Sequence, residues 1–528
     1  MSLVPWPTRV EPAPGRLEVA ALSPDASWDE HWSGRCADLP ALADLPLRGD
    51  GLPLRLVPRE SGTTDGLPAL PPLGPDGEVA DERYRLRVDR TGVEVHAAGP
   101  EGAFRALTTL RQLLAAAGGV DGIARPDVAE IQDGPRYGWR GLSLDVVRTF
   151  FTVAEVMAVI DLMTLYKLNV LHLHLTDDQG WRLEVPGRPE LTRTSAGTAY
   201  AGRPGGFYST AELREIVRYA ADRFVRVVPE VDIPGHSGAV LRAYPHLGRG
   251  HGEPGGYASH LHLDHRQPET FVFLQQVVDT LVDLTPGPYL HLGGDEAFGM
   301  GAEEYATFWS RFTAEVDLRG RRLVGWQELS RGGLGGDPLL QHWRDSSRTD
   351  AEGTAEMRRA LGLPDAAQLA LLVAAGRADV DRMRRDGNRV IVSPATVAYL
   401  DRPYADVSTD PEDVALRDAL GLRLYEPMTV EEYYAWDPAT VVPDLPADQV
   451  VGVEAAMWTE TVASVAELQF MLLPRLAGVA EKAWSTAPRP WQDFRGRLAG
   501  QVPLWEAQGW RYFRAASVWP DPPVGPAR

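Results

Sequence analysis

Residues 138–146 read GWRGLSLDV, and residues 169–175 read NVLHLHL. Both are short apolar runs of the length that is typical of a buried strand. Between them lies a stretch with helical character that begins at Thr152, three residues before Glu155, in the pattern of a capping box. A strand, a helix and a strand in this order predict a βαβ unit with two parallel strands.

The same alternation continues toward the C-terminus, where a second capping box, Ser209 with Glu212, begins another helical stretch. Eight strands that alternate with helices favour a (β/α)8 TIM barrel, whose active site lies at the carboxyl ends of the strands. The eight strand candidates are Gly138–Val146, Asn169–Leu175, Val225–Asp232, Tyr289–Asp295, Leu323–Trp326, Leu339–Trp343, Asn388–Pro394 and Val450–Trp458.

The chain before the barrel has a different pattern. Tyr84–Asp89 and Val93–Ala97 alternate apolar and polar residues across a turn, which indicates a hairpin, and Gly102–Ala116 has helical spacing. We therefore expect an α/β protein in which a small α+β domain precedes the barrel, with a linker at Pro126–Pro135. The expected domains are residues 1–135 (α+β), 136–512 (barrel) and 513–528 (C-terminal tail).

Composition narrows the function. The 528 residues are 44% hydrophobic and 24% charged, as in globular proteins. A formal net charge of −20 repels phosphate backbones and anionic lipid, so neither nucleic acid nor a membrane is an expected partner. The single cysteine, Cys36, excludes an internal disulfide and a metal cluster held by several thiolates.

The sequence lacks an apolar run of the ~18 residues that a membrane span needs, and its first residues lack a basic segment followed by an apolar one. These features favour a cytoplasmic protein. Secretion stays open as an alternative, because removal of a signal peptide leaves a similar start.

Polar residues gather where the predicted strands end. The second strand runs into His174 and Asp177, the third into Asp232 and His236, and the fourth ends GGDE at residues 293–296. Neighbouring strand residues point to opposite faces, so Asp295 and Glu296 share a pocket only if the chain leaves strand geometry there, which Gly293 and Gly294 permit. Two carboxyl groups in one pocket have different protonation states, so that one donates a proton and the other stays charged.

Each feature also has an ordinary structural interpretation. An Asp-Glu pair in an acidic chain is usually a solvated loop. His172 and His174 lie on one strand face, but without a third ligand at a recognised spacing they are more typical of buried histidines than of a metal site. We expect no catalytic metal and no cofactor.

Aromatic residues mark the later strand ends. Trp326, Trp343 and Trp458 each end a predicted strand, where their rings favour a pocket wall suited to the apolar face of a sugar or to an acetyl methyl, although core packing would also place them there. Tyr399, Asp401 and Glu460 add hydrogen-bonding groups at the same ends.

Taken together, these residues and their neighbours in the chain resemble sequence motifs of the β-N-acetylhexosaminidases of glycoside hydrolase family 20. The resemblance covers the chain from about residue 80 to 515. The strings that carry it include RGLSLDVVR (140–148), HLTDDQGWR (174–182), PEVDIPGH (229–236), GGDE (293–296), VGW (324–326), QHW (341–343), YLD (399–401), WDP (436–438) and WTE (458–460).

The resemblance implies a role for each matching residue. Glu296 is then the general acid and base, and Asp295 orients the 2-acetamido group of the substrate, whose carbonyl oxygen is the nucleophile. His236 and Asp177 form a hydrogen-bonded chain to Glu296, and Asp232 supports Asp295. The implied sugar-binding residues are Arg148, Trp326, Trp343, Tyr399, Asp401, Trp436, Trp458 and Glu460.

The resemblance thus implies an exo-acting hydrolase that removes terminal β-linked GlcNAc or GalNAc from an oligosaccharide or glycoconjugate, with retention of configuration and through an oxazoline-like intermediate. Two alternatives remain. One is a relative that releases a disaccharide or a modified hexosamine, for which the long Arg344–Asp386 segment offers room. The other is a sugar-binding protein without activity, although such a protein is expected to lack Asp295 or Glu296.

Overall fold

A closed barrel of eight parallel strands forms the larger part of the protein, as the sequence predicts. The computed structural model describes residues 1–25, 45–58, 66–67, 81–119, 121–250, 260–336, 338–344, 366–408, 410–487 and 489–520. The barrel strands, each overlapping its sequence-based candidate, are β7 (Trp139–Asp145), β8 (Val170–His174), β9 (Arg226–Ile233), β12 (Tyr289–Gly293), β13 (Arg322–Trp326), β14 (Leu339–His342), β15 (Val390–Val392) and β16 (Val450–Met457).

Helices surround the barrel, and both predicted capping boxes are confirmed. In α4 (Val153–Leu165), Thr152 accepts from the Glu155 amide and Glu155 from the Thr152 amide; α6 (Thr210–Ala221) begins in the same way. The remaining helices after β8 are α5 (Glu190–Ser195), α7 (Gly238–Ala243), α8 (Pro268–Leu284), α9 (Ala302–Glu315), α11 (Ala366–Asp386), α12 (Pro411–Ala419), α13 (Val430–Tyr434), α14 (Val465–Leu472), α15 (Arg475–Trp484), α16 (Trp491–Ala499) and α17 (Val502–Ala507), and a two-stranded sheet pairs β10 (Gly248–Arg249) with β11 (His262–Leu263).

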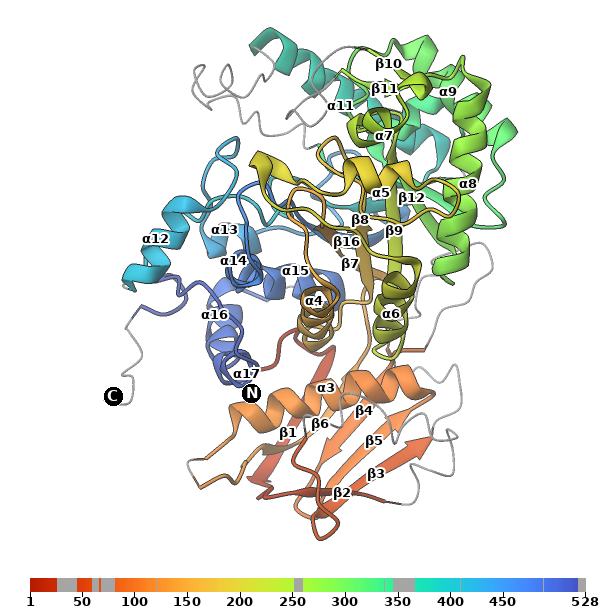
Figure 1. The fold of residues 1–528 in the computed structure, drawn as a ribbon. Helices are drawn as coiled ribbons and strands as arrows, with labels where there is room; N and C mark the ends of the chain where they lie inside the picture. Colours follow the sequence, from red (N-terminus) through yellow and green to blue (C-terminus); the bar gives the residue numbers. More distant parts are fainter. Residues whose placement is uncertain are drawn as a thin grey trace.

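The N-terminal domain is a sheet covered by one long helix. Its strands follow the order β1-β6-β4-β5-β3-β2, and the predicted hairpin is the antiparallel pair β4 and β5. Helix α3 (Pro100–Ala116) lies between this sheet and the barrel (Figure 1). The strands are β1 (Arg9–Arg16), β2 (Leu22–Pro24), β3 (Leu52–Pro58), β4 (Tyr84–Val88), β5 (Val93–Ala97) and β6 (Asp127–Asp133).

The structure differs from the sequence-based expectation at the predicted linker and at the predicted C-terminal tail. The predicted linker at Pro126–Pro135 is wrong, because most of it forms β6, which pairs with both β1 and β4 and buries Ala129 and Ile131. Its alternating pattern was the signal for a strand. At the other end, Phe513 lies fully buried with its ring 4.3 Å from that of Tyr404, so the barrel domain continues into residues expected to form a tail.

Buried charges hold the two domains together. Glu82 of the N-terminal domain accepts from Arg105 Nε at 2.8 Å and from Arg140 Nη2 of the barrel at 2.5 Å. The Lys167 ammonium of the barrel lies 2.8 Å from the Asp133 carboxylate of β6.

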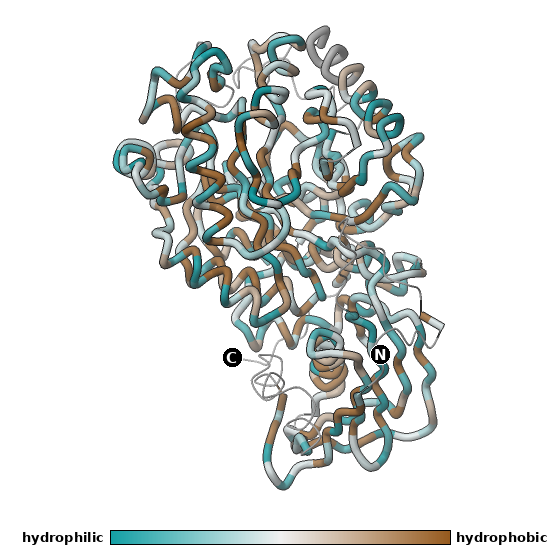
Figure 2. Tube along the Cα trace, turned by 90° about the vertical axis from the view of Figure 1, so that its right-hand side faces the viewer, coloured by the Kyte–Doolittle hydropathy of each residue, from teal (hydrophilic) through white to brown (hydrophobic). Residues whose placement is uncertain are grey.

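Hydrophobic residues run along the inner strands and the inward faces of the helices (Figure 2). None of the helices in the described ranges is long and apolar enough to cross a bilayer.

The interior of the barrel is layered. Near the amino ends of the strands lies an apolar layer that consists of Trp139, Val170, Val228, Tyr289, Val324, Leu339, Ile391 and Val451. Two residues further along several strands, the inward side chains become polar: His172, Glu230, His291, Trp326 and Gln341, joined by Glu454 of β16. Inward residues of a TIM barrel stack in such layers, so the polar layer supports the groups at the mouth above it.

Candidate active site

The Asp295-Glu296 pair follows β12 in a backbone that has left strand geometry. Gly293 and Gly294 have φ of 64° and 102°, and Glu296 has φ of 43°. A Cβ at Gly293 would overlap the Asp232 carboxylate, whose Oδ1 accepts from the Gly294 amide at 3.1 Å. The turn that the two glycines permit therefore forms, and it directs both carboxyl groups toward His236.

His236 is the group that both carboxyl groups share. Its Nε2 lies 3.6 Å from Asp295 Oδ2 and 3.8 Å from Glu296 Oε2, while its Nδ1 lies 3.1 Å from Asp177 Oδ1. Burial opposes protonation of the ring, but Asp177 and Asp232 raise the pKa of His236 well above its ordinary value. The structure thus brings all five predicted catalytic residues together at one rim.

Charges at the rim separate the protonation states of the acids. Burial raises the pKa of Glu296 above its ordinary value, and the neighbouring Asp295 raises it further. The cations His236 and Arg344 lower this pKa, but they do not cancel the rise. Burial would also raise the pKa of Asp177, but Arg148, with Nη2 2.6 Å from Asp177 Oδ2, and His236 hold it well below its usual range. Glu296 is therefore suited to hold a proton, and Asp177 to remain charged.

Aromatic rings form a wall beside these acids. The Trp458 ring centroid lies 6.0 Å from that of Trp326 and 6.1 Å from that of Tyr399, and Trp343 lies parallel to Tyr399 at 6.3 Å. Tyr425, which the sequence analysis missed, packs edge-on against Tyr399 at 6.3 Å. It sits in an irregular connection, without strand periodicity to indicate it.

Several acidic oxygens at the rim have no hydrogen-bond partner among the described residues: Asp295 Oδ1, both oxygens of Asp401, and Glu460 Oε2. Burial raises the pKa of Asp401 well above its ordinary value, and Glu460 adds to that effect. Because buried polar atoms are normally paired, acceptors of this kind suit a ligand that brings its own N–H and O–H groups. A sugar with an amide is such a ligand.

Two charged residues beside Glu296 were missed by the sequence analysis. Arg344 Nη2 lies 3.4 Å from Glu296 Oε1 and 3.4 Å from Glu328 Oε1, and Glu328 accepts from the Trp343 indole at 3.0 Å. Burial raises the pKa of Glu328 to about 7. Their only sequence signal is that they lie close to Trp326 and Trp343 in the chain.

Trp436 is not brought together with the other predicted site residues. Its indole donates to the Tyr433 carbonyl at 3.0 Å, and it lines a small cavity with Arg136 and Asp437. Because Arg136 precedes β7, this cavity lies toward the amino ends of the strands, away from the rim. The residues 345–365 of the long segment lie outside the described residues, as does Cys36.

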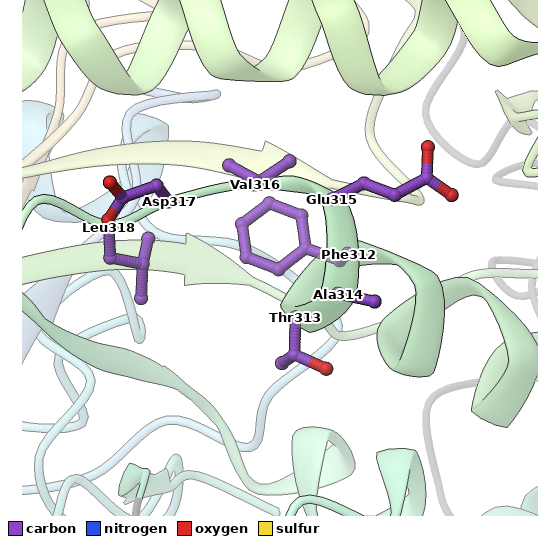
Figure 3. A pocket seen from close by; sticks show the side chains of 7 residues that line it. All are labelled: Phe312, Thr313, Ala314, Glu315, Val316, Asp317 and Leu318. Atoms are coloured by element: carbon purple, nitrogen blue, oxygen red, sulfur yellow. The ribbon is translucent and has the colours of Figure 1, made fainter.

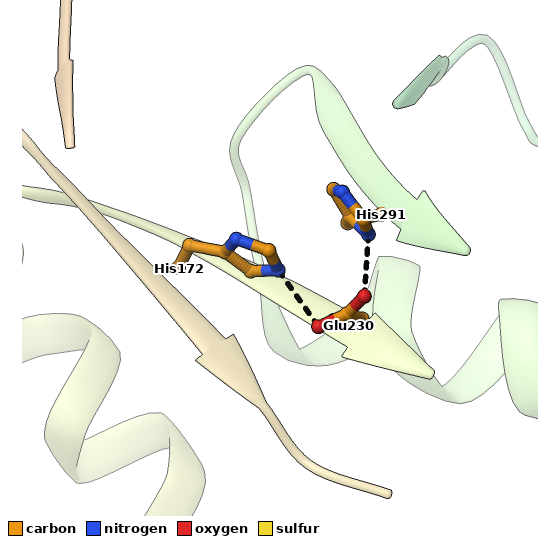
Figure 4. A group of neighbouring side chains, drawn as sticks. All are labelled: His172, Glu230 and His291. Atoms are coloured by element: carbon orange, nitrogen blue, oxygen red, sulfur yellow. Dashed lines mark ion pairs between the residues drawn. The ribbon is translucent and has the colours of Figure 1, made fainter. Parts of the chain in front are cut away.

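His172, Glu230 and His291 have the residue types of a metal site (Figure 4). However, His172 faces a carboxylate with each ring nitrogen: Nδ1 lies 2.8 Å from Glu454 Oε1 and Nε2 3.0 Å from Glu230 Oε2. Against the opposing effect of burial, these acids raise the pKa of His172 to about 10. A doubly protonated imidazole has no lone pair to offer a cation, so this trio is better described as an ion-pair network.

A further pocket of about 430 Å³ is lined by Phe312–Leu318 at the end of α9 (Figure 3). All its lining residues come from one short stretch, with two acids, Glu315 and Asp317, and no histidine among them. It lacks the groups for catalysis, unlike the rim.

Comparison with known proteins agrees with the geometry. The catalytic domain model of glycosyl hydrolase family 20 matches residues 137–305 and 363–487, and the model for domain 2 of that family matches residues 1–133. The beta-N-acetylhexosaminidase of Cellulomonas fimi is 42% identical over 495 residues, which cover 92% of this chain and 90% of that protein.

Two solved structures extend the comparison. The GH20 beta-N-acetylhexosaminidase of Streptomyces coelicolor A3(2) has 35% identity and a TM-score of 0.79, with 100% of this chain and 99% of that chain covered. A mutant Streptomyces plicatus beta-hexosaminidase in complex with the product GlcNAc has 34% identity and a TM-score of 0.80, with coverage of 98% and 97%. With the barrel, the preceding domain and the rim in agreement, this chain belongs to glycosyl hydrolase family 20 and is a glycoside hydrolase.

Proposed function

We propose that the protein is an exo-β-N-acetylhexosaminidase that hydrolyses terminal, non-reducing β-linked GlcNAc or GalNAc with retention of configuration. The observation that carries this proposal is the convergence of Asp295 and Glu296 on His236, at 3.6 and 3.8 Å, beside an aromatic wall. The GlcNAc product named for the Streptomyces plicatus structure supports the choice of sugar.

In the first step, the substrate supplies the nucleophile. Its acetamido carbonyl oxygen attacks the anomeric carbon while Glu296, whose raised pKa keeps a proton available, protonates the departing glycosidic oxygen. Asp295 accepts the acetamide N–H through its unpartnered Oδ1 and stabilises the positive charge that develops on nitrogen. The product of this step is an oxazoline-like ring and a free alcohol.

In the second step, Glu296 acts as a base. It removes a proton from a water molecule, which attacks the anomeric carbon from the face that the leaving group vacated. The bond from that carbon to the acetamido oxygen breaks and restores the acetamide, so two inversions give net retention. His236, held by Asp177, stabilises the charged form of Glu296 between the steps. Asp401 and Glu460 accept hydrogen bonds from the outer hydroxyl groups.

A comparison of glycosides tests the proposal. The nitrophenyl β-glycosides of GlcNAc and GalNAc should be hydrolysed, whereas the matched β-glucoside, which lacks both nucleophile and anchor, should be almost inert. A thiazoline analogue of the cyclised intermediate should bind at least ~10² times more tightly than GlcNAc. Hydrolysis of the glucoside at a comparable rate, or a glycosyl ester on Asp295 or Glu296 in mass spectra, would rule out substrate assistance.

The same assay addresses the alternatives. A sugar-binding protein without activity would hydrolyse none of the three glycosides, and a disaccharide-releasing enzyme would prefer a longer substrate. The cytoplasmic location stays a prediction, which fractionation of the native cells would check.

A further inference from the structure

Glu230 is a buried carboxylate of β9 to which the mechanism above gives no role. Its Oε1 accepts from the Trp326 indole at 2.9 Å and lies 2.9 Å from His291 Nδ1. Its Oε2 lies 2.5 Å from His174 Nδ1 and 3.0 Å from His172 Nε2. These partners belong to β8, β12 and β13, so one side chain of β9 contacts three further strands of the barrel. Figure 4 shows Glu230 between two of these partners, His172 and His291.

Two of these partners, His174 and Trp326, continue toward the reacting groups, and both pack against Trp458, with ring centroids 5.1 and 6.0 Å from it. His174 Nε2 lies 2.9 Å from Asp177 Oδ2, and the other oxygen of Asp177 lies 3.1 Å from His236, the neighbour of Glu296. Trp458 is part of the aromatic wall. Glu230 therefore contacts the supports of both the proton-transfer groups and the sugar pocket.

A carboxylate is the side chain that this position needs. Oε2 faces His174 Nδ1 and His172 Nε2, and Oε1 accepts from the Trp326 indole. His291 Nδ1 lies beside Oε1 and also accepts from the Gly293 amide at 3.2 Å. An ionised carboxylate is the side-chain group that accepts at both oxygens. The charged and titratable groups that face it are His172 and His174 of β8, His291 of β12 and Asp232 of β9 itself, with Glu454 of β16 beyond His172.

The charges alternate along this network. Burial opposes ionisation of Glu230, but its histidine neighbours hold its pKa well below the ordinary value. His291 itself has a lowered pKa, because burial outweighs the effect of Glu230 on it, so His172 and His174 are the cations of the network. His174 is likewise opposed by burial, yet Glu230 and Asp177 raise its pKa to about 9. His174 is thus a cation between two carboxylates, with Arg148 Nη1 3.5 Å from its Nε2, and both cations favour the charged form of Asp177.

We infer that Glu230 is a positioning residue for the hydrolysis proposed above: it orients the His174–Asp177–His236 chain toward Glu296 and fixes the plane of the Trp326 indole. This inference rests on the proposed function and adds to it a residue that touches neither the substrate nor the reacting atoms.

The variant Glu230→Gln tests the inference, because its amide places an N–H opposite a nitrogen donor and removes the charge beside His174. We expect kcat for the GlcNAc glycoside to fall ~10- to 100-fold, as misplacement of reacting groups does. Without its anionic partner, His174 loses its proton more readily. Asp177 then lacks a neighbouring cation, so its pKa rises. As a result, the acidic limb of the pH–rate profile should move to higher pH. The thiazoline analogue should bind more weakly.

Glu454→Gln is the matched control. Glu454 is also fully buried and accepts from Trp139 Nε1 at 2.7 Å and from Gln341 Nε2 at 2.8 Å, besides its contact with His172. It contacts neither His174 nor Trp326 in the described structure. We expect Glu454→Gln to lose about as much thermal stability as Glu230→Gln. The acidic limb of its pH–rate profile should stay at the wild-type position. Equal pH shifts in both variants, or a wild-type kcat and pH profile in Glu230→Gln, would overturn the inference.

His174→Gln provides a second test that also serves if Glu230→Gln does not fold. It interrupts the route to Asp177 and leaves the Trp326–Glu230 bond intact, so the acidic limb should move to higher pH. Because the His174 ring also packs edge-on against Trp458 at 5.1 Å, the pH profile and not KM is the readout of this variant. An unmoved limb in this variant contradicts the inference. A wild-type protein without hydrolysis counts against the proposed function, whereas an active wild type with unaffected variants counts against Glu230 alone.

Discussion

The protein buries charged groups in two places, the junction between the domains and the mouth of the barrel, and it treats them differently. At the junction, Glu82 lies between Arg105 and Arg140, and the Asp133 carboxylate accepts from Lys167, Tyr84 and Trp484. Every one of these carboxylates has its counter-charge or donors within the fold.

At the mouth, the acids outnumber the cations that pair with them. Arg148 and Arg344 reach Asp177 and Glu296, but Asp295 Oδ1, both oxygens of Asp401 and Glu460 Oε2 have no partner among the described residues. An unpaired buried acid costs stability, since burial disfavours its charged form. The difference indicates that the junction is built for stability, whereas the mouth gives up stability for binding and catalysis.

The largest effect is expected at the mouth, in Glu296→Gln. The amide cannot deliver a proton, so turnover of a natural disaccharide should fall by ~10² to 10⁴, while thermal stability stays unchanged or rises. Kinetics with this substrate and with an aryl glycoside measure the loss, and the aryl glycoside, with its better leaving group, should be affected less. Near wild-type turnover of the disaccharide would remove Glu296 from its assigned role.

At the junction, we expect Glu82→Gln to have the opposite profile. It removes the carboxylate that Arg105 and Arg140 share, so Arg140 loses its ion pair while Arg105 keeps Glu101 at 3.0 Å. This should lower the free energy of unfolding by about 3–5 kcal/mol. The kcat of the folded fraction should remain that of the wild type. Denaturant unfolding and active-site titration provide the two values.

Asp127→Asn is the control for this measurement. Asp127 pairs with Arg16 in the same domain, but its side chain is 47% exposed, and exposed pairs contribute only ~0–1 kcal/mol. If both variants lost the same stability, burial of the Glu82 network would not be the reason.

Asp401→Asn sharpens the comparison, because it should improve stability and impair binding together. Removing an unpaired buried acid should raise the melting temperature at pH 8, where the carboxyl is most strongly driven to ionise. Loss of a charge-assisted hydrogen bond to a sugar hydroxyl should raise KM by roughly 10- to 100-fold, at about 1.5–3 kcal/mol for such a bond. A lower melting temperature with unchanged KM would show that Asp401 stabilises the fold, as the acids at the domain junction do, and does not bind the sugar.

An effect on the pH dependence of stability concerns Glu101, the one junction acid here with a strongly raised pKa. Burial, with Glu82 adding to it, raises the pKa of Glu101 from 4.5 to about 7. The folded state therefore holds a proton that the unfolded state releases, so the stability that this group contributes is complete below about pH 4.5 and is lost as the pH rises through about 7. Glu101→Gln should reduce the loss of stability between pH 5 and pH 8 by about 2.5 kcal/mol, because nearly two units of the pKa difference fall in this range at ~1.4 kcal/mol each.

Unfolding of the wild type and of this variant at both pH values is the measurement. Glu11→Gln, a change at an exposed residue of the same domain, should follow the wild type. A variant with the full pH dependence of the wild type would show that Glu101 does not titrate in this window.

Local sequence patterns predicted much of this architecture. The eight barrel strands, the hairpin of β4 and β5 and both capping boxes depend on residues close together in the chain, and each is found where its pattern placed it. The turn at Gly293-Gly294 belongs to this group, because its geometry depends on the residue type itself. The sequence analysis missed the strand β6. Its residues alternate as in a strand, but the prolines and the glycine at its two ends are typical of a linker.

Other features depended on closure of the barrel. Arg344 meets Glu296, and Glu230 meets His174, His291 and Trp326, only because parallel strands in a particular register bring distant residues to one layer. Trp436 shares the residue type of the aromatic wall yet lies toward the other end of the strands. The sequence by itself determined which elements form and which residue types stand at their ends. Tertiary structure alone decided which of those side chains meet, because side-chain contacts across a barrel depend on register and layer, which no local pattern encodes.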